Sequence, residues 1–224
     1  RVYAPCFSWC ITTDKFSIPK YHRIGQNNVI YSQWAAINEH EVPTGTHSYA
    51  HDVSFVGAYH PYRQWFINQL AAQGIRVSAF GHGWPQGALS SQQMSELFVR
   101  SKINLNISNS TSFSFSYLFS SLRAFLTALK SRKASSQIKA RNFEIPFFGG
   151  FQLTDYVPTL ENYLQIGSEV CCYSSVEEAA LLIRYYLEQE NENEREAIRL
   201  AGHQRALQQH GYIHRIEQVI RAVS

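Results

Sequence analysis

The chain has 224 residues, 45% of them hydrophobic, and a formal net charge of +3. This is enough for a substantial buried core, and so mild a charge gives no argument for nucleic-acid binding. No apolar run approaches the roughly 20 residues that cross a bilayer. The four cysteines, Cys6, Cys10, Cys171 and Cys172, lack the paired spacing of zinc sites. We expect reduced, structural thiols in a cytoplasmic protein.

Residues 1–50 are predicted to be the tail of a preceding N-terminal domain plus a linker. They contain short apolar segments, followed by the polar, turn-rich sequence EVPTGTHSYAH. Fifty residues are too few for a core of their own. Because the chain starts at Arg1 without a methionine or a signal-peptide pattern, we expect it to be a fragment of a longer protein.

Strand-like and helix-like segments alternate from residue 52 onward. The strand-like segments are short apolar runs at residues 52–57, 75–80, 102–108, 151–156 and 170–173. The helix-like segments begin at Pro61, at Ser90 with Gln93 in a capping box, at Thr159 and at Ser175 with Glu178. The alternation predicts an α/β fold, with a Rossmann-like parallel sheet covered by helices on both faces over residues 51–211.

The carboxyl terminus is predicted to be helical. A polar helix over residues 191–209 breaks at Gly211, and a last helix covers residues 212–224. The last helix carries an apolar stripe of Ile213, Ile216, Ile220 and Val223.

A long segment separates the third and fourth strands. It has about forty residues, more than one crossover requires. Within it Leu118–Leu129 forms an apolar helical face in a basic segment. One interpretation is an amphipathic helix that rests on a membrane surface or on a protein partner. The other, which we favour, is a helix packed on its own domain.

Four loops are predicted to form one crevice, because ligands bind beyond the carboxyl ends of the strands in an open parallel sheet. These loops are residues 57–63, 81–84, 106–109 and 139–144. The candidate binding residues in them are Gly57, Arg63, His82, Gly83, Trp84, Asn106, Asn109, Lys139, Arg141 and Glu144. Gly57 permits close backbone approach to a phosphate, and Arg63 adds a charge-assisted contact. Trp84 and His82 either face a nucleobase or only shape a turn.

The run KARNFEIPFFGG at residues 139–150 is the most informative motif. Lys139 and Arg141 lie just before a short helix, whose first N–H groups add to the attraction for a phosphate. Glu144 is suited to grasping a pair of hydroxyls. Because proline does not fit deep inside a helix, Pro146 predicts a helix start close to residues 142–144. Gly149 and Gly150 end the run and complete the set of candidate binding residues.

Several other chemistries find no support. The chain has no HExxH, no GxSxG elbow and no Walker A lysine, and no GxGxxG follows the first strand. Metalloproteases, serine hydrolases, P-loop enzymes and dehydrogenases are therefore disfavoured. No metal-ligand cluster is expected.

The chain resembles the CgeB-like (spore-maturation-type) glycosyltransferases of the GT-B fold, in their C-terminal, donor-binding half. The resemblance rests on spaced motifs: YHRIGQNNVIYSQWAAIN at 21–38, SFVGAYHPYR at 54–63, GHGWPQGALS at 81–90, SKINLNIS at 101–108, QIKARNFEIPFFGGFQLTDY at 137–156 and GYIHR at 211–215. It implies a nucleotide-sugar donor as substrate, such as a UDP sugar, with no cofactor and no metal. The acceptor, whether protein, lipid or polysaccharide, stays open.

The resemblance also implies roles for single residues. Arg63, with Lys139 or Arg141, would be catalytic by neutralising the leaving diphosphate, and Glu144 would hold the ribose hydroxyls as in retaining enzymes. Ser136 stands where related families carry a second acidic residue, which leaves the stereochemical outcome open. The last helix would pack back toward the N-terminal half. Because most of that half is missing, we expect weak donor binding and little transfer. The alternative function is a non-catalytic binding or scaffold module.

Overall fold

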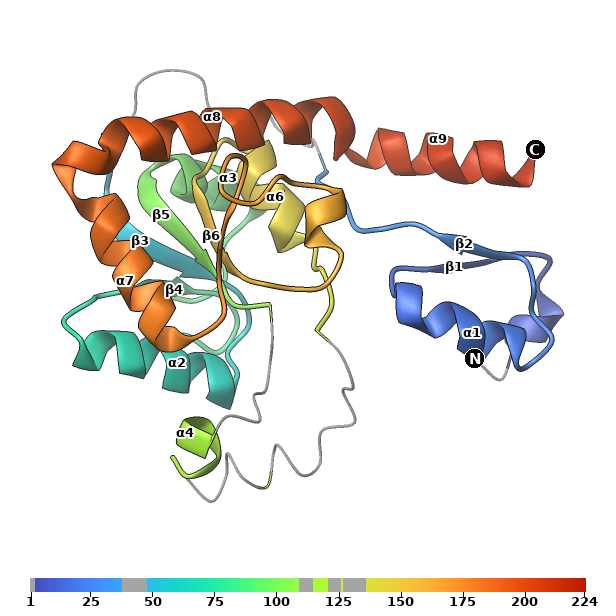
Figure 1. The fold of residues 1–224 in the computed structure, drawn as a ribbon, viewed down its shortest axis with the longest axis horizontal. Helices are drawn as coiled ribbons and strands as arrows, with labels where there is room; N and C mark the ends of the chain where they lie inside the picture. The colour runs from blue at the N-terminus through green and yellow to red at the C-terminus, as the bar shows by residue number, and fades with distance from the viewer. Residues whose placement is uncertain (1–2, 38–47, 109–114, 121–125, 127–135) are drawn as a thin grey trace.

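The computed structural model describes residues 3–37, 48–108, 115–120, 126 and 136–224 (Figure 1). Its main body is a five-stranded, fully parallel sheet with the order β4-β3-β5-β6-β7. The strands are β3 (His51–Val56), β4 (Ser78–Phe80), β5 (Ser101–Asn106), β6 (Gln152–Asp155) and β7 (Cys171–Tyr173). Each strand falls within or beside a predicted apolar run, so the predicted parallel sheet is confirmed.

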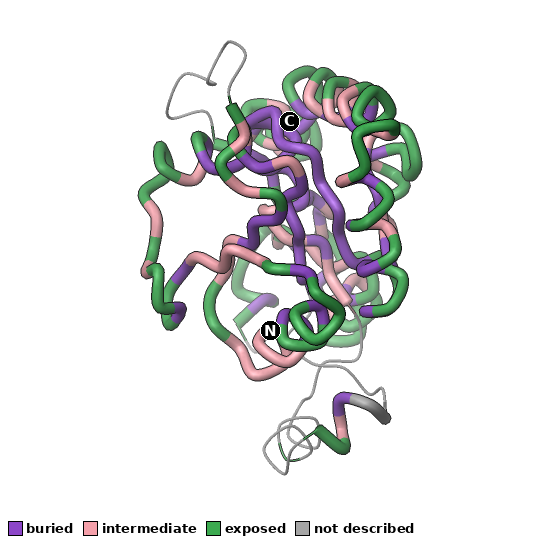
Figure 2. The backbone as a smooth tube through the Cα atoms, turned by 90° about the vertical axis from the view of Figure 1, so that its left-hand side faces the viewer, coloured by how far each residue is buried: buried purple, intermediate pink, exposed green. Residues whose placement is uncertain are grey.

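Helices cover both faces of this sheet, as predicted. One face carries α2 (Pro61–Ala72) and α7 (Val176–Leu187), and the other carries α3 (Ser91–Val99), α6 (Arg141–Phe147) and α8 (Glu192–Gln209). On the first face, Phe66 of α2 and Ile183 of α7 pack in one cluster with Phe55 of β3. On the second, Phe98 of α3 and Ala206 of α8 share a cluster with residues of α6. Figure 2 shows the buried strands at the centre and exposed turns around them.

The predicted caps are present at two helix starts. At α3 the Ser90 side chain accepts from the Gln93 N–H, and the Gln93 side chain accepts in return from the Ser90 N–H. At α7 the Ser175 hydroxyl accepts from the Glu178 N–H at 3.1 Å. These local bonds satisfy donors that a helix start leaves open.

Two predicted helices differ from expectation. The segment at residues 159–166 forms only one 3₁₀ turn, η3 (Leu160–Asn162). Thr159, the predicted first helical residue, has a left-handed φ of 77° and stands outside the turn. The helix α6 begins at Arg141, slightly before the predicted start, and Pro146 lies in its last turn instead of its first. Because proline has no N–H, the Asn142 carbonyl has no helical donor from position 146, and the helix ends one residue after the proline.

The N-terminal segment forms a small separate sheet of two parallel strands, β1 (Cys10–Thr12) and β2 (Val29–Tyr31), with α1 (Ile18–His22) beside it. The last helix, α9 (Tyr212–Val223), runs from the end of α8 alongside this unit (Figure 1). Gln218 of α9 donates to the Tyr31 carbonyl at 3.3 Å. The four residues of the apolar stripe defined above are 46–60% exposed. The predicted stripe is thus present and partly open to solvent.

The segment after β5 is described only in part. Helix α4 (Phe115–Leu118) places the buried Tyr117 against Tyr62 and Trp65, with ring centres 5.1 and 5.3 Å apart. Leu126 is exposed, and most of the predicted Leu118–Leu129 face lies outside the described residues. None of the described helices is long and apolar enough to cross a membrane.

The four cysteines carry free thiols. Cys171 packs in the core cluster of α2 and α7, while Cys172 packs against the opposite cluster around Phe143. The two neighbours in β7 therefore point to opposite faces, as predicted for adjacent strand residues. Burial raises the pKa of Cys171 to about 11 and that of Cys172 to about 12.

Candidate functional site

A cleft of about 320 Å³ opens at the carboxyl ends of β3 and β5. Three of the four loops predicted to meet there contribute to its lining. The lining residues are Trp34, Phe55, Val56, Gly57, Arg63, Asn106, Ser108, Lys139, Ala140, Arg141 and Glu144. Six of the candidate residues from the sequence are thus brought together, although they lie far apart along the chain.

Arg63 lies in the first turn of α2 and reaches back over the loop that follows β3. Its Nε donates to the Ile107 carbonyl at 3.1 Å, and its Nη1 donates to the Ala58 carbonyl at 2.9 Å. Its Cζ lies 5.7 Å from the centre of the Phe55 ring. These contacts tie the loop after β3 to the end of β5 and fix the direction of the positive charge.

Gly57 is needed for this arrangement. A Cβ at this position would lie 2.8 Å from Cζ of Phe55 and 3.3 Å from Nη1 of Arg63. Any larger residue would therefore displace the Phe55 ring and press against the guanidinium. The absence of a side chain keeps the cleft open next to the charge.

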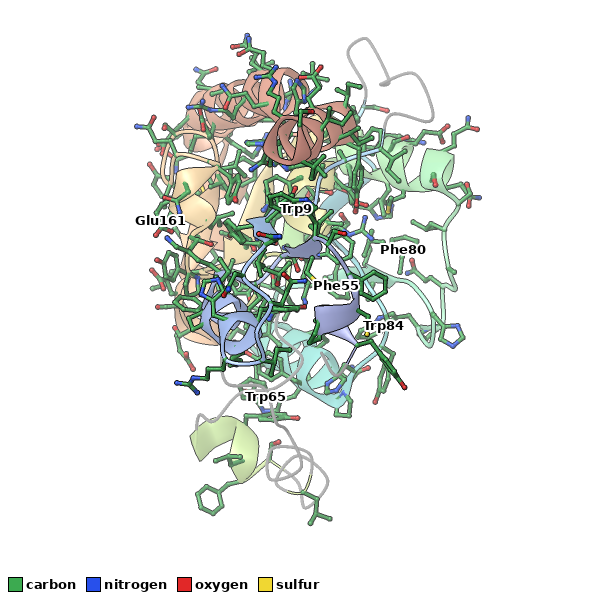
Figure 3. The ribbon with its side chains drawn as sticks, turned by 90° about the vertical axis from the view of Figure 1, so that its right-hand side faces the viewer. Trp9, Phe55, Trp65, Phe80, Trp84 and Glu161 are labelled. Carbon is green, nitrogen blue, oxygen red and sulfur yellow. The ribbon has the colours of Figure 1, made fainter. Side chains whose placement is uncertain are left out.

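The loop with the sequence GHGWPQG packs behind Gly57 and does not line the cleft. The Trp84 side chain is buried, its Nε1 donates to the Gly57 carbonyl at 2.8 Å, and its ring stands edge-on to Phe55 at 5.9 Å. Figure 3 shows Phe55 and Trp84 close together. Trp84 was predicted either to face a nucleobase or to shape a turn, and its position in the structure is explained by packing.

The other loop members are placed by the same packing. His82 is exposed, and its carbonyl accepts from the Tyr59 N–H at 2.8 Å. A Cβ at Gly83 would lie 2.7 Å from Cβ of Tyr59. The backbone of this loop is thus fixed against the loop that follows β3.

Arg141 and Glu144 form an ion pair on the first turns of α6. Nη1 of Arg141 lies 2.7 Å from Oε2 of Glu144, and each side chain is 21% exposed. The same guanidinium contacts the sulfur of Met94 and lies 5.4 Å from the centre of the Phe98 ring. Glu144, which is predicted to hold hydroxyls, is therefore paired with Arg141, which is predicted to bind a phosphate.

Partial burial shapes the electrostatics of both arginines. Burial lowers the pKa of Arg63, nearby Asp155 offsets part of this effect, and Arg141 adds to it. Burial also lowers the pKa of Arg141, and Glu144 offsets it. Because arginine stays protonated at physiological pH, the cleft holds two like charges with reduced hydration. An anion placed between them would lower the free energy of the site.

A network of buried side chains joins the strand ends beneath the cleft. Asn142 is fully buried: its Oδ1 accepts from the Lys139 N–H at 3.0 Å, and its Nδ2 donates to Oγ1 of Thr154 at 3.2 Å. Asn106 donates to the same Thr154 oxygen at 3.1 Å, and Oδ1 of Asp155 accepts from the Ser108 N–H at 2.8 Å. The network fixes the segment before α6 against β5 and β6.

Several of these residues were not predicted from the sequence. Ser108 follows β5 within the predicted loop 106–109, and Asp155 is the last residue of β6, so the strand-end rule had the signal for both. Asn142 lies inside the KARNFEIPFFGG run, where the sequence predicts the start of a helix and gives no sign that this side chain is buried beneath the cleft. Trp34 comes from before the predicted linker, where no sequence signal pointed to the cleft.

The remaining candidates lie elsewhere. Gly149 and Gly150 follow the carboxyl end of α6: the Gly149 carbonyl accepts from Arg199, and a Cβ at Gly150 would lie 2.6 Å from Nδ2 of Asn104. Both glycines are outside the cleft lining. Ser136 is half-buried and also outside it. Asn109 lies outside the described residues.

Within the described part of the chain, no group of three or more His, Cys, Asp or Glu residues is placed to hold a metal ion. Arg63, Lys139 and Arg141 are the cations among the described residues that line the cleft. A single carboxylate, Glu144, accompanies them.

The fold is similar to that of several solved glycosyltransferases. TarM of S. aureus matches with a TM-score of 0.64 at 8% identity, over 98% of this chain and 44% of TarM. Anabaena HepE, solved with UDP, matches with a TM-score of 0.60 at 11% identity, over 96% of this chain and 63% of HepE. The pneumococcal O-GlcNAc transferase GtfA, solved with UDP and GlcNAc, matches with a TM-score of 0.58 at 11% identity, over 96% of this chain and 44% of GtfA.

These likenesses show a GT-B-like α/β fold, and this chain spans about half the length of the structures it matches. No curated protein sequence is recognisably similar to it. A family model described as "Glycosyl transferase-like" matches residues 63–221, which begin at the arginine of the cleft and include α6. The chain therefore belongs to the glycosyl transferase-like family.

Proposed function

We propose that this chain binds a nucleotide-diphosphate sugar and serves as the donor-binding part of a glycosyltransferase. The observation that carries the proposal is the convergence of Arg63, Lys139 and Arg141 with Glu144 in one cleft at the strand ends. A ligand that suits this set has several negative charges next to a pair of hydroxyls. A nucleoside diphosphate has both.

The two arginines would act on the leaving group. In the transfer, the bond between C1 of the sugar and the oxygen of the second phosphate breaks, and the electron pair stays on the diphosphate. Arg63 and Arg141 stabilise this growing charge, and they do so strongly because the cleft excludes part of the water. The acceptor oxygen then bonds to the oxocarbenium-like C1 and loses its proton. The departing diphosphate, which has gained the electron pair of the broken bond, is the base that takes up this proton.

Glu144 would change partners when the donor binds. Its Oε2 is paired with Nη1 of Arg141 at 2.7 Å. A diphosphate competes for the same guanidinium, which leaves the carboxylate oxygens available to accept hydrogen bonds from the ribose hydroxyls. The ion pair thus holds both groups near their working positions before the ligand arrives.

The finer assignment rests on the resemblance and on the neighbours. The motifs at residues 54–63 and 137–156 favour a CgeB-like, metal-independent type. Glu144 in the second motif favours a retaining mechanism, and the four cysteines without paired spacing favour a cytoplasmic protein. UDP is the first nucleotide to test, because the solved structures of HepE and GtfA contain it. The acceptor would be a protein, a lipid or a polysaccharide.

Calorimetric titration with UDP, GDP and dTDP tests the proposal. We expect at least one of them to bind, and Arg63→Gln and Arg141→Gln each to weaken binding about tenfold or more, since charge-assisted hydrogen bonds contribute about 1.5–3 kcal/mol. Arg184→Gln is the matched control: Arg184 is exposed, donates to the Gln73 carbonyl and lies at the other end of the sheet. Absence of binding for all three nucleotides would reject the donor site and favour a non-catalytic scaffold module.

A further inference from the structure

Trp34 is an exposed aromatic residue in the wall of a cleft that also carries three cations and a carboxylate. Its side chain is 40% exposed, and it shares the lining with Lys139, Arg141 and Glu144. A ligand that covers this ring removes apolar area from water, which contributes favourable binding free energy, and the cations beside the ring attract negative charge on the same ligand. This position therefore calls for a ligand with a flat, apolar face.

The backbone of Trp34 is held firmly although its ring is open. The Trp34 carbonyl accepts from Nε of Arg215 at 3.4 Å. Beyond it Ala36 is fully buried and pairs with the junction of α8 and α9, accepting from the Tyr212 N–H at 3.1 Å and donating to the His210 carbonyl at 2.9 Å. The fold thus fixes where the indole stands, which reduces the entropy lost when a ligand binds to it.

The other tryptophans of the main body are used for packing. Trp65 stacks on Tyr62 and meets Tyr117, and Trp84 stands against Phe55 and Tyr59. Trp34 has no ring partner among the residues that the structure describes. The faces of its indole are therefore not occupied by another aromatic side chain of that part of the chain.

We infer that Trp34 is the aromatic platform on which the base of the bound nucleotide stacks. The inference rests on the proposed function. It assigns to Trp34 the contact with the nucleobase that the sequence had suggested for Trp84. The base is joined directly to the ribose, which places it near Glu144, and Trp34 shares the lining with Glu144. A cleft of about 320 Å³ is at the small end for ligand sites, which favours the nucleotide as its occupant, with the sugar projecting outward.

Titration of the 224-residue chain and its Trp34→Ala and Trp34→Phe variants with UDP, GDP, dTDP and pyrophosphate tests this inference. We expect Trp34→Ala to weaken the best nucleotide about tenfold, the usual effect of removing one stacked ring. Trp34→Phe should retain affinity within about threefold, because a smaller ring still stacks. Pyrophosphate, which has no base, should bind all three proteins equally. Trp9→Ala is the matched control, since Trp9 is 41% exposed and outside the cleft lining.

Tryptophan fluorescence gives a second readout. Nucleotide should quench part of the emission of the unaltered chain and of Trp9→Phe, and this quenching should disappear in Trp34→Phe. Equal nucleotide affinity in Trp34→Ala, or an equal loss of pyrophosphate binding, would overturn the platform while leaving the donor site in place. If no nucleotide binds the unaltered chain, the proposed function fails and the inference fails with it.

Discussion

Gly81→Ala should lower the free energy of unfolding by about 3 kcal/mol, whereas Gly87→Ala should lower it by about 1 kcal/mol. Both glycines adopt a positive φ, 130° at Gly81 and 74° at Gly87. Such a conformation costs an alanine about 1–3 kcal/mol, and the cost is greater at Gly81 because its φ lies outside the left-handed helical region. The two sites differ in the space around them. A Cβ at Gly81 would lie 2.2 Å from the Gly57 carbonyl oxygen, while a Cβ at Gly87 meets nothing within 4 Å.

The extra cost at Gly81 comes from backbone that must move. Overpacking of this kind costs about 1–3 kcal/mol, and the atom displaced belongs to Gly57, which lines the cleft. Urea unfolding followed by circular dichroism measures both variants, and nucleotide titration measures the cleft. We expect Gly81→Ala to weaken nucleotide binding and Gly87→Ala to leave it unchanged. If the two variants lose the same stability within about 0.5 kcal/mol, the contact of the new Cβ with Gly57 does not contribute to the loss.

Two further predictions concern residues near the cleft. Burial lowers the pKa of His210 to about 4, below the value of about 6.5 in the unfolded chain. The stability that the neutral imidazole contributes should therefore be complete above about pH 6.5. It should be lost as the pH falls toward 4, by up to about 3 kcal/mol. Urea unfolding at pH 7.5 and 4.5 measures this loss, which His210→Gln should reduce. Asn142→Ala removes the hydrogen bond from the Lys139 N–H to Asn142 and the hydrogen bond from Asn142 to the Thr154 hydroxyl. It should therefore lower the free energy of unfolding by about 2 kcal/mol and weaken nucleotide binding. The exposed Asn68→Ala serves as its control in both assays, and an equal effect of the two variants would contradict this role of Asn142.

The sheet could be predicted because its signals are local. Short apolar runs that end in glycine or a polar residue mark the parallel strands, and the capping boxes at Ser90 and Ser175 mark helix starts within a few positions. From these elements the strand-end rule alone brought Arg63, Arg141 and Glu144 into one crevice. No information beyond element order was needed for that step.

The misses come from contacts between distant parts of the chain. Trp84 was a candidate for a nucleobase, yet whether an aromatic ring after a strand is open or buried depends on neighbours such as Phe55 and Tyr59. Trp34 reaches the cleft only because residues before the linker pair with the junction near Gly211. Gly149 was grouped with Lys139 by sequence proximity, but the helix between them carries it away from the cleft.

The cleft draws its walls from residue 34, residues 55–63, residues 106–108 and residues 139–144. No short segment of the chain holds such a site, so a ligand that fills it recognises the folded state alone. By mass action, a ligand at 100 times its dissociation constant then adds about 2.7 kcal/mol to the stability of the fold. The cellular supply of that ligand would accordingly set the fraction of molecules that stays folded, and with it their survival against proteolysis.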